Sequence, residues 1–365
     1  MIRATSRLQP LVPASLFQLL IPLFSAVVLA TTHAAEPAAP NSLADLQQRI
    51  TSRISEPRFA SALWGVKVAS LDSGNTLYEH NAQKLFSPAS NSKLYTVALA
   101  LTRLGPDFRI KTSLYSQARP GPDGKLSGDL VVFGRGDPTI CARLHKDDIY
   151  AALEPLVDVL TNAGVKEVSG NLVADDSFIH GAPWGSGWDW GDAENYYGAE
   201  ISALTINDNC LEIRVQPGSP GDPCVLALAP PSDYLKLVNE THTAEKGASR
   251  RIRLFRPLES NTVYVSGQLP EGGGIYTDDV TCHQPAGLFL SFLKQAMERH
   301  GIRVDGTLVV SDPENPGMKP LDISPLMELG HMESPPMTEI ARDILKPSQN
   351  LYADLVLAQV GEHSR

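Results

Sequence analysis

A serine and a lysine three residues apart stand at the start of an apolar segment, SPASNSKLYTVALALTRLG at residues 87–105. Pro88 favours a helix start and Gly105 a left-handed cap at the helix end. Apolar residues recur between them at the helical spacing that predicts a buried helix: Leu94, Val97, Ala98, Leu101 and Leu104. Positions three apart share a helix face, so the Ser90 hydroxyl and the Lys93 amine can meet. A lysine whose pKa is lowered by burial can take the hydroxyl proton and make Ser90 a nucleophile.

A second short pattern occurs near the end of the chain, in KPSQNLYADLVL. Ser348, Gln349 and Asn350 open the last predicted helix, and Ser348 taken alone is best interpreted as a helix N-cap. Likewise, Ser90 and Lys93 taken alone fit a capping serine and a lysine that reaches out to solvent. In this order, however, Ser-x-x-Lys and Ser-x-Asn together are typical of penicillin-binding proteins and serine β-lactamases.

The elements that must position these residues can be read along the chain. LADLQQRITSRIS predicts an amphipathic helix capped by Asn41 or Ser42, and ALWGVKVASLDSGNTLYEHN predicts two strands joined by a turn at 72–75. From about 110 to 285, short strand-like runs alternate with Gly and Pro. Helical periodicity returns in AGLFLSFLKQAMERHG, MTEIARDILK and the final segment. We therefore predict one α/β (α+β) domain interrupted by a large β-rich insertion.

Composition and charge limit where the protein can act and which partners it can bind. The 365 residues carry 31 Lys and Arg against 41 Asp and Glu, a net charge of -10 without a basic run, which argues against a nucleic-acid partner. At the N-terminus, Arg3 and Arg7 precede a long apolar stretch with small residues at its end, which predicts a signal peptide cut near Ala34 or Ala35. An uncleaved anchor, which would add peripheral membrane contact, is the alternative. Both place the body of the protein outside the cytoplasm.

An exported chain can keep disulfides. The four cysteines are Cys141, Cys210, Cys224 and Cys282. None forms a Cys-x-x-Cys pair, so we expect two disulfides, or one disulfide and two buried thiols, and no zinc site. The nine histidines show no metal-ligand spacing, and the sequence predicts neither a metal nor an organic cofactor.

With both motifs in place, the chain resembles the exported D-alanyl-D-alanine carboxypeptidase/endopeptidase family. These are low-molecular-mass class C penicillin-binding proteins with a large insertion between their first and second motifs. The resemblance runs from about residue 45 to the C-terminus and includes GDLVVFGRGDPT, WGSGWDWGDAENYYGAEISALTINDN and SQNLYADLVL. It implies a penicillin-binding-protein/β-lactamase-like transpeptidase domain. The implied segments are a signal peptide at 1–35, transpeptidase parts at 40–109 and 286–365, and the insertion at 110–285.

The resemblance also implies a reaction. Ser90 would attack the carbonyl between the two terminal D-Ala residues of a peptidoglycan stem peptide, with Lys93 as general base. Ser348 would relay a proton to the departing amine, and Asn350 would bind the substrate amide and orient Lys93. Water would then hydrolyse the acyl-enzyme, and β-lactams would acylate Ser90 in the same way as covalent inhibitors. Carboxypeptidase and endopeptidase action both stay open.

Two further features have two interpretations each. Asp137 in GRGDPT could face the free amino end of a diamino acid in the stem peptide, although a turn-forming Asp before Pro138 is the favoured reading. A run of aromatic residues could form a platform for a glycan, although packing is favoured: Trp184, Trp188, Trp190, Tyr196 and Tyr197.

The third family motif, Lys-Thr-Gly on a strand after the Ser-x-Asn helix, does not occur before the chain ends at Arg365. The nearest match, Lys111-Thr112-Ser113, precedes the second motif and predicts an ordinary strand. We therefore expect the C-terminal strands of the catalytic sheet to be missing and turnover by this chain to be weak or absent. The alternative function is that of a non-catalytic truncated remnant that binds peptidoglycan or a cell-wall protein.

Overall fold

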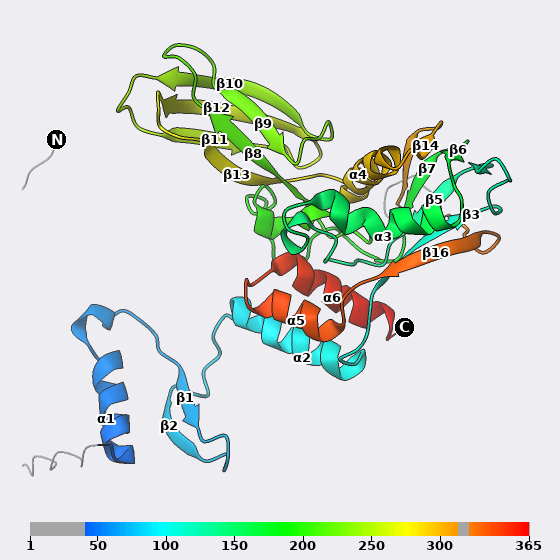
Figure 1. Ribbon diagram of the computed structural model, residues 1–365. Helices are drawn as coiled ribbons and strands as arrows, with labels where there is room; N and C mark the ends of the chain where they lie inside the picture. Colours follow the sequence, from blue (N-terminus) through cyan, green and yellow to red (C-terminus); the bar gives the residue numbers. More distant parts are fainter. Residues whose placement is uncertain (1–40, 313–320, 365) are drawn as a thin grey trace, which may run out of the picture. The chain divides into compact units, whose positions relative to one another are not determined.

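The computed structural model describes residues 41–312 and 321–364, which divide after Ser87 into two compact units (Figure 1). Helices and sheets alternate along the chain, which confirms the predicted mixed α/β class. The predicted signal peptide lies outside the described residues. Within the described ranges, no helix combines the length and the apolar character that a membrane crossing requires.

The first unit consists of one helix and a two-stranded antiparallel sheet: α1 (Leu43–Ile54), β1 (Val66–Ala69) and β2 (Thr76–His80). Of the two predicted caps, Ser42 caps α1, because its hydroxyl accepts a backbone N–H from the first turn at 3.1 Å. The Gln47 side chain donates to the carbonyl oxygen of Leu77 at 2.7 Å. This bond holds the helix to the predicted hairpin.

The second unit is built around a five-stranded sheet with the order β15-β7-β5-β3-β16. Its strands are β3 (Lys111–Ser116), β5 (Leu130–Phe133), β7 (Leu172–Asp175), β15 (Leu308–Ser311) and β16 (Met327–Glu333). The strands β15, β7 and β5 run parallel, while β3 lies antiparallel between β5 and β16. The Lys111-Thr112-Ser113 segment is thus an ordinary strand, as predicted, and Lys111 forms an ion pair with Glu333 at 3.5 Å. This sheet joins strands from both sides of the predicted boundary at residue 285.

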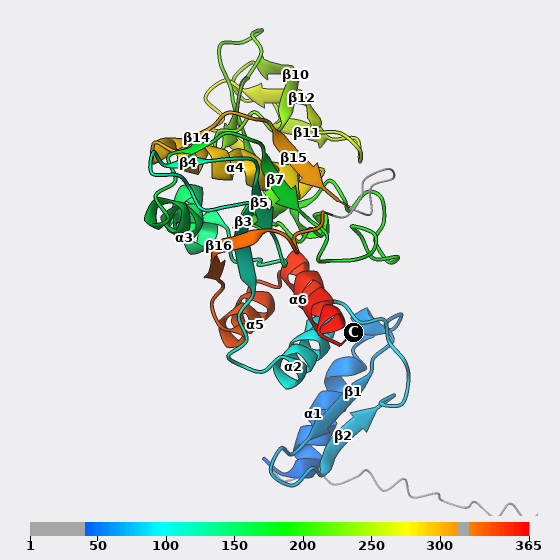
Figure 2. The ribbon, with the colours of Figure 1, turned by 90° about the vertical axis from the view of Figure 1, so that its right-hand side faces the viewer.

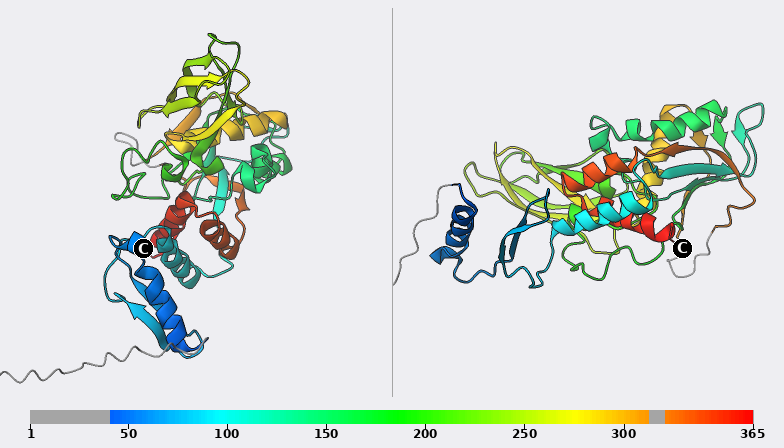
Figure 3. Two further views of the ribbon diagram at one scale, coloured as in Figure 1. Left: turned by 90° about the vertical axis from the view of Figure 1, so that its left-hand side faces the viewer. Right: turned by 90° about the horizontal axis from the view of Figure 1, so that it is seen from below.

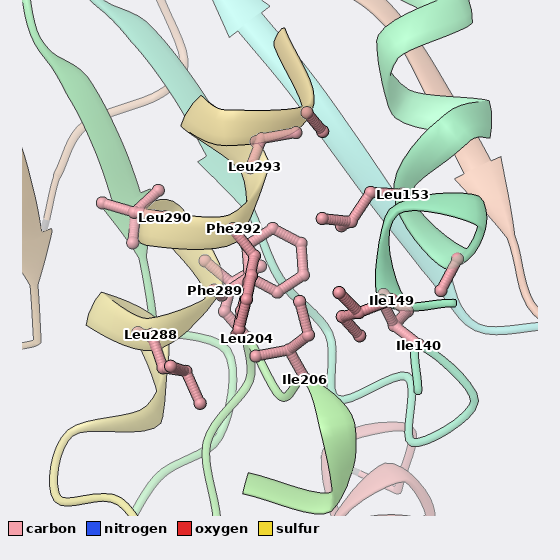
Figure 4. Close-up of a cluster of buried hydrophobic side chains, with 14 of the residues drawn as sticks. Ile140, Ile149, Leu153, Leu204, Ile206, Leu288, Phe289, Leu290, Phe292 and Leu293 are labelled. Carbon is pink, nitrogen blue, oxygen red and sulfur yellow. The ribbon is translucent and has the colours of Figure 1, made fainter. Parts of the chain in front are cut away.

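Two helices, α3 (Ile149–Asn162) and α4 (Pro285–Arg299), pack against each other and against this sheet. Figure 4 shows Ile149 and Leu153 of α3 near Phe289 and Phe292 of α4. Burying each of these side chains contributes about 1.5–3 kcal/mol to stability. A small parallel sheet lies beside them: β4 (Lys125–Leu126), β6 (Glu167–Val168) and β14 (Arg303–Val304).

Two three-stranded sheets lie within the predicted β-rich region, and the strands of one of them, β10, β11 and β12, are labelled in Figure 2. One has the order β10-β12-β11: β10 (Lys236–Ala244), β11 (Arg251–Phe255) and β12 (Thr262–Pro270). The other has the order β13-β8-β9: β8 (Cys210–Gln216), β9 (Val225–Ala229) and β13 (Tyr276–Thr281). Alternate residues of the central strands are buried in one shared core, such as Val263 and Val265 of β12 and Ile213 and Val215 of β8.

Three helices form a separate layer (Figure 3): α2 (Lys93–Arg103), α5 (Met337–Leu345) and α6 (Asn350–Glu362). Gly105 ends α2 with φ +92°, which confirms the predicted left-handed cap. The prediction of a buried helix is correct for one face of α2 only. It packs on α5 and α6 through Val97 and Ala100, whereas Leu94 is 58% exposed.

All four cysteines are buried free thiols, which contradicts the predicted disulfide. The side-chain contacts of two of these cysteines show the role that the thiols have instead. The sulfur of Cys141 lies 3.4 Å from the Tyr352 hydroxyl, and that of Cys224 lies 3.7 Å from the Thr243 hydroxyl. These cysteines act as small apolar residues with a weak polar contact.

Candidate active site

Ser90 lies in a single 3₁₀ turn, Ser90–Ser92, that leads directly into α2. The helix begins at Lys93 and not at Pro88 as the sequence predicts. Lys93 Nζ donates to Ser90 Oγ at 3.2 Å, so the expected contact is present. Ser90 is exposed while Lys93 is buried, which leaves the hydroxyl accessible and shields the amine from water.

The second motif brings two more side chains to the same amine. Ser348 Oγ accepts from Lys93 Nζ at 3.5 Å, and Asn350 Oδ1 also accepts from it. The interpretation of Ser348 as an N-cap is wrong, because Gln349 occupies that position and α6 begins at Asn350. Ser348 has φ +65°, a left-handed conformation that is uncommon for serine and persists where the surroundings hold it. In this turn the Ser348 hydroxyl lies within reach of Lys93 and does not cap the helix.

The site contains one carboxylate that sequence reasoning missed. Asp354 lines the same pocket as Ser90 and Lys93, one helical turn after Asn350. Burial lowers the pKa of Lys93, while the charge of Asp354 raises it. Burial likewise raises the pKa of Asp354, and Lys93 lowers it. The four-residue spacing from Asn350 was the available signal in the sequence.

A pocket of about 560 Å³ opens over these groups, within the size range of small-molecule sites. Besides Ser90, Lys93, Asn350 and Asp354, its lining includes Gly185, Gly187 and Trp188 from the segment that precedes β8. The Trp188 ring stacks on that of Tyr197, with centroids 6.5 Å apart. Asn350 Nδ2 donates to the Tyr197 carbonyl oxygen at 3.0 Å. The segment around residues 185–197 therefore both walls the pocket and orients the Asn350 amide.

The aromatic run does not behave as a single packed group. Trp184 is half-buried and donates through Nε1 to the Gly198 carbonyl oxygen at 2.8 Å, which fits the packing interpretation. Trp190, in contrast, is 77% exposed. Packing therefore accounts for Trp184 but not for Trp190.

Helix α6 is fixed to the β-rich region at two further points. The Tyr352 hydroxyl accepts from Arg143 Nη2 at 2.9 Å, and Arg143 in turn pairs with Asp208 at 3.5 Å. About two helical turns after Tyr352, Gln359 Nε2 donates to the Arg135 carbonyl oxygen. Because Asn350 is the first residue of α6, these bonds determine where its side chain lies.

Asp137 is not brought to the pocket. It is buried, and its Oδ1 accepts from the backbone N–H of Thr139 at 2.9 Å and from the Thr139 hydroxyl at 2.7 Å. This is the turn arrangement favoured from the sequence. Burial raises the pKa of Asp137 to about 6.

Comparison with known proteins agrees with this geometry. The model of the D-Ala-D-Ala carboxypeptidase 3 (S13) family matches residues 46–365. The chain is 30% identical over 351 residues to a D-alanyl-D-alanine carboxypeptidase of Actinomadura sp. (strain R39), covering 94% of this chain and 62% of that protein. It is 22% identical over 299 residues to D-alanyl-D-alanine carboxypeptidase DacB of Haemophilus influenzae, covering 81% of this chain and 58% of that protein.

Solved structures show the same fold. Penicillin binding protein 4 from Haemophilus influenzae superposes with a TM-score of 0.68 at 22% identity, over 82% of this chain and 62% of that chain. Its complex with a β-lactam gives a TM-score of 0.59 at 20% identity, over 80% and 59% of the two chains. The predicted penicillin-binding-protein type of fold is thereby confirmed. Although it spans only 58% to 62% of the length of the two curated relatives, the chain is a member of the D-Ala-D-Ala carboxypeptidase 3 (S13) family.

Proposed function

We propose that the protein is a serine-type D-Ala-D-Ala peptidase that acts on peptidoglycan stem peptides through an acyl-enzyme on Ser90. One observation carries the proposal: Lys93 Nζ lies within hydrogen-bond reach of Ser90 Oγ, Ser348 Oγ and Asn350 Oδ1, and Ser90, Lys93 and Asn350 line one pocket. A nucleophile, an amine base and a second hydroxyl at this separation are what acyl transfer requires.

Lys93 acts as the general base in this scheme. Its lowered pKa increases the fraction of neutral amine near neutral pH, and the 3.2 Å contact lets it take the Ser90 proton as Oγ attacks the carbonyl carbon. The Ser90 backbone N–H, which precedes the first turn of α2, can donate to the developing oxyanion.

Ser348 completes the proton path. Its hydroxyl touches the protonated Lys93 and can pass that proton to the amine of the departing D-Ala. Asn350 keeps Lys93 in place through Oδ1, and the Nδ2 hydrogen that is not bonded to Tyr197 can donate to the substrate amide. Water then hydrolyses the Ser90 ester and frees the enzyme. The same acylation serves both release of a terminal D-Ala and cleavage of a D-Ala cross-link.

β-Lactams are the expected covalent inhibitors, since the solved neighbour was obtained in complex with one. We also propose that the protein is exported to the periplasm by its N-terminal signal peptide, in keeping with a cell-wall substrate. Asp137 takes no part in this proposal, because its side chain is engaged by Thr139.

The test is covalent labelling of the purified chain, without residues 1–35, by a fluorescent penicillin. The label should appear on the wild-type chain in a denaturing gel and be absent from Ser90→Ala. Thr102→Ala is a matched control, because it removes an exposed hydroxyl from α2 outside the pocket and should keep the label. An unlabelled wild-type chain, or a labelled Ser90→Ala chain, contradicts the proposal. Release of D-Ala from a pentapeptide then separates turnover from acylation.

A further inference from the structure

Three exposed aromatic rings lie along two adjoining pockets of the second unit, apart from the pocket of Ser90. Trp190 and Phe255 line a pocket of about 380 Å³. Phe255 also lines a second pocket, of about 310 Å³, together with Tyr264. The exposed fractions are 77% for Trp190, 40% for Phe255 and 37% for Tyr264. The shared Phe255 makes the two pockets one aromatic groove, which is the name used below.

Strand register places two of these rings side by side. Phe255 of β11 is the cross-strand partner of Tyr264 of β12, and the ring centroids are 6.2 Å apart. The next pair along the same face is Arg253 and Ser266. The opposite face of β12 carries the buried Val263 and Val265. The outward face therefore presents aromatic and polar side chains together.

The third ring is held close to this face by a buried guanidinium. Arg256 Nη1 donates to the carbonyl oxygens of Pro257 and Leu258 at 3.1 and 3.0 Å, next to Phe255. Its Nη2 donates to the Ala193 carbonyl oxygen at 3.3 Å, in the segment that carries Trp190. Arg256 thus joins the backbone segments that carry Phe255 and Trp190, which lowers the backbone entropy lost when a ligand binds.

The polar groups around the rings indicate the kind of ligand. Glu194 and Glu259 line the first pocket, and Glu240, Arg253 and Ser266 line the second. Sugar rings offer a face of C–H groups that stacks on aromatic rings and an edge of hydroxyl groups that binds carboxylates and guanidinium groups. A nucleic acid or an anionic lipid surface would meet carboxylates and a chain of net charge -10. The chemistry of the groove fits an uncharged saccharide chain.

The position of the groove further narrows the kind of saccharide that it can bind. Trp188 lines the pocket of Ser90, and Trp190, two residues later, lines the first pocket of the groove. The groove and the Ser90 pocket are therefore connected through one short segment. The stem peptides that we propose as substrates are attached to a polymer of N-acetylated amino sugars. A polymer bound in the groove would bring its attached peptide towards Ser90.

We propose that the aromatic groove formed by Trp190, Phe255 and Tyr264 binds the glycan strand of peptidoglycan. The choice of glycan rests on the proposed peptidase function, whereas the saccharide chemistry of the groove does not. Binding consists of stacking on the three rings and hydrogen bonds to the flanking Glu and Arg side chains. No bond of the saccharide is made or broken.

The test uses a linear hexamer of β-1,4-linked N-acetylglucosamine, without peptide, titrated into the purified chain. Calorimetry reports binding in all variants, and the intrinsic fluorescence of the four tryptophans is a second readout. Trp190→Ala, Phe255→Ala and Tyr264→Ala should each raise the Kd roughly tenfold, as expected for aromatic anchors. Tyr95→Ala is the matched control, since Tyr95 is 78% exposed on α2 outside the groove, and it should leave the Kd unchanged. The disaccharide should bind more weakly than the hexamer because it cannot span both pockets.

Phe255→Leu and Tyr264→Leu distinguish a loss of binding from a loss of folding. Each keeps an apolar side chain but loses the flat ring, so the hexamer should still bind more weakly. The proposal is overturned if the hexamer does not bind the wild-type chain, if the groove variants bind as the wild type does, or if they change only the self-association of the chain. Ser90→Ala should bind the hexamer with the wild-type Kd. Hexamer binding without penicillin labelling would contradict the peptidase function alone, and labelling without hexamer binding would contradict the glycan groove alone.

Discussion

Asn350 Nδ2 donates to the carbonyl oxygen of Tyr197 at 3.0 Å, and the Oδ1 of the same side chain accepts from Lys93. The two bonds fix which end of the amide faces the lysine, because only the oxygen can accept and only the nitrogen can donate. The orientation of a proposed catalytic side chain thus depends on a backbone carbonyl from the β-rich region. The region between the two motifs is part of the site and not a separate appendage.

Replacement of Asn350 tests this dependence. Asn350→Ala removes the acceptor that holds Lys93 and the link to Tyr197, so Lys93 is free to move away from Ser90. We expect acylation by a fluorescent penicillin to fall roughly 100-fold, the scale seen when a single oriented polar group is lost from an active site. The rate constant of labelling in a time course is the measurement.

Asn239→Ala is the matched control for this experiment. Asn239 Nδ2 also donates to a backbone carbonyl oxygen, that of Cys224, at 2.7 Å, but within the β-rich region. Acylation should be unchanged in this variant. A normal rate in Asn350→Ala, or an equal loss in Asn239→Ala, would show that the bonds of Asn350 do not position Lys93.

Whether a contact in the site could be predicted from the sequence depends on whether residue spacing or the path of the backbone produces it. Ser90 meets Lys93 because a spacing of three residues brings side chains to one helical face, and this spacing is visible in the sequence. The Tyr197 carbonyl and the left-handed turn at Ser348 have no such signature, since they arise from the path of the backbone. Sequence patterns therefore identify the reacting groups more readily than the groups that orient them.

The same reasoning accounts for the fold. Strand and helix periodicities predicted the mixed α/β class, because they reflect local burial. Partners across the five-stranded sheet, such as β3 and β16, are set by pairing over long sequence separations, which periodicity does not record. The aromatic groove likewise depends on the register of Phe255 with Tyr264. The number of cysteines led to a wrong prediction of disulfides, because a folded chain can bury cysteine thiols as small apolar residues.

Burial lowers the pKa of Lys93, and Asp354 is the charged group that opposes this shift. Its negative charge raises the pKa of the lysine against the lowering caused by burial. Asp354→Asn removes that charge, so the pKa of Lys93 should fall further and the neutral amine should form at lower pH. The acid limb of the acylation rate plotted against pH should therefore move to lower pH.

The control for Asp354→Asn is Asp158→Asn, an equal change of charge at an exposed position of α3. Its acid limb should coincide with that of the wild type. A shift of the Asp354→Asn limb to higher pH would mean that Asp354 acts on Lys93 in some way other than by its charge.

Tyr352 ties the helix that carries Asn350 to the β-rich region. Tyr352→Phe leaves the ring in place but removes the acceptor of Arg143, whose guanidinium then lacks one buried partner. We expect the free energy of unfolding to fall by about 1–3 kcal/mol, measured by urea denaturation. Tyr95→Phe, at an exposed position of α2, should change it by less than about 0.5 kcal/mol. Equal stability of Tyr352→Phe and the wild type would mean that the hydroxyl does not anchor α6.

Asp137 should make the stability of the second unit depend on pH. Burial raises its pKa to about 6 from 3.8, so the fold favours the neutral carboxyl. Because the folded pKa is the higher one, this stability is fully present below about pH 4 and is lost as the pH rises through 6. The loss amounts to about 3 kcal/mol at most, from a shift of roughly two units.

Asp137→Asn cannot ionise and keeps an oxygen that accepts from Thr139. The free energy of unfolding of the variant relative to the wild type should therefore be larger at pH 7.5 than at pH 4, measured by urea denaturation at both values. Asp158→Asn, exposed on α3, should show the same difference from the wild type at both pH values. If the Asp137→Asn difference also stays constant, the carboxyl of Asp137 does not ionise within this range in the folded protein, and its burial has no effect on stability near neutral pH.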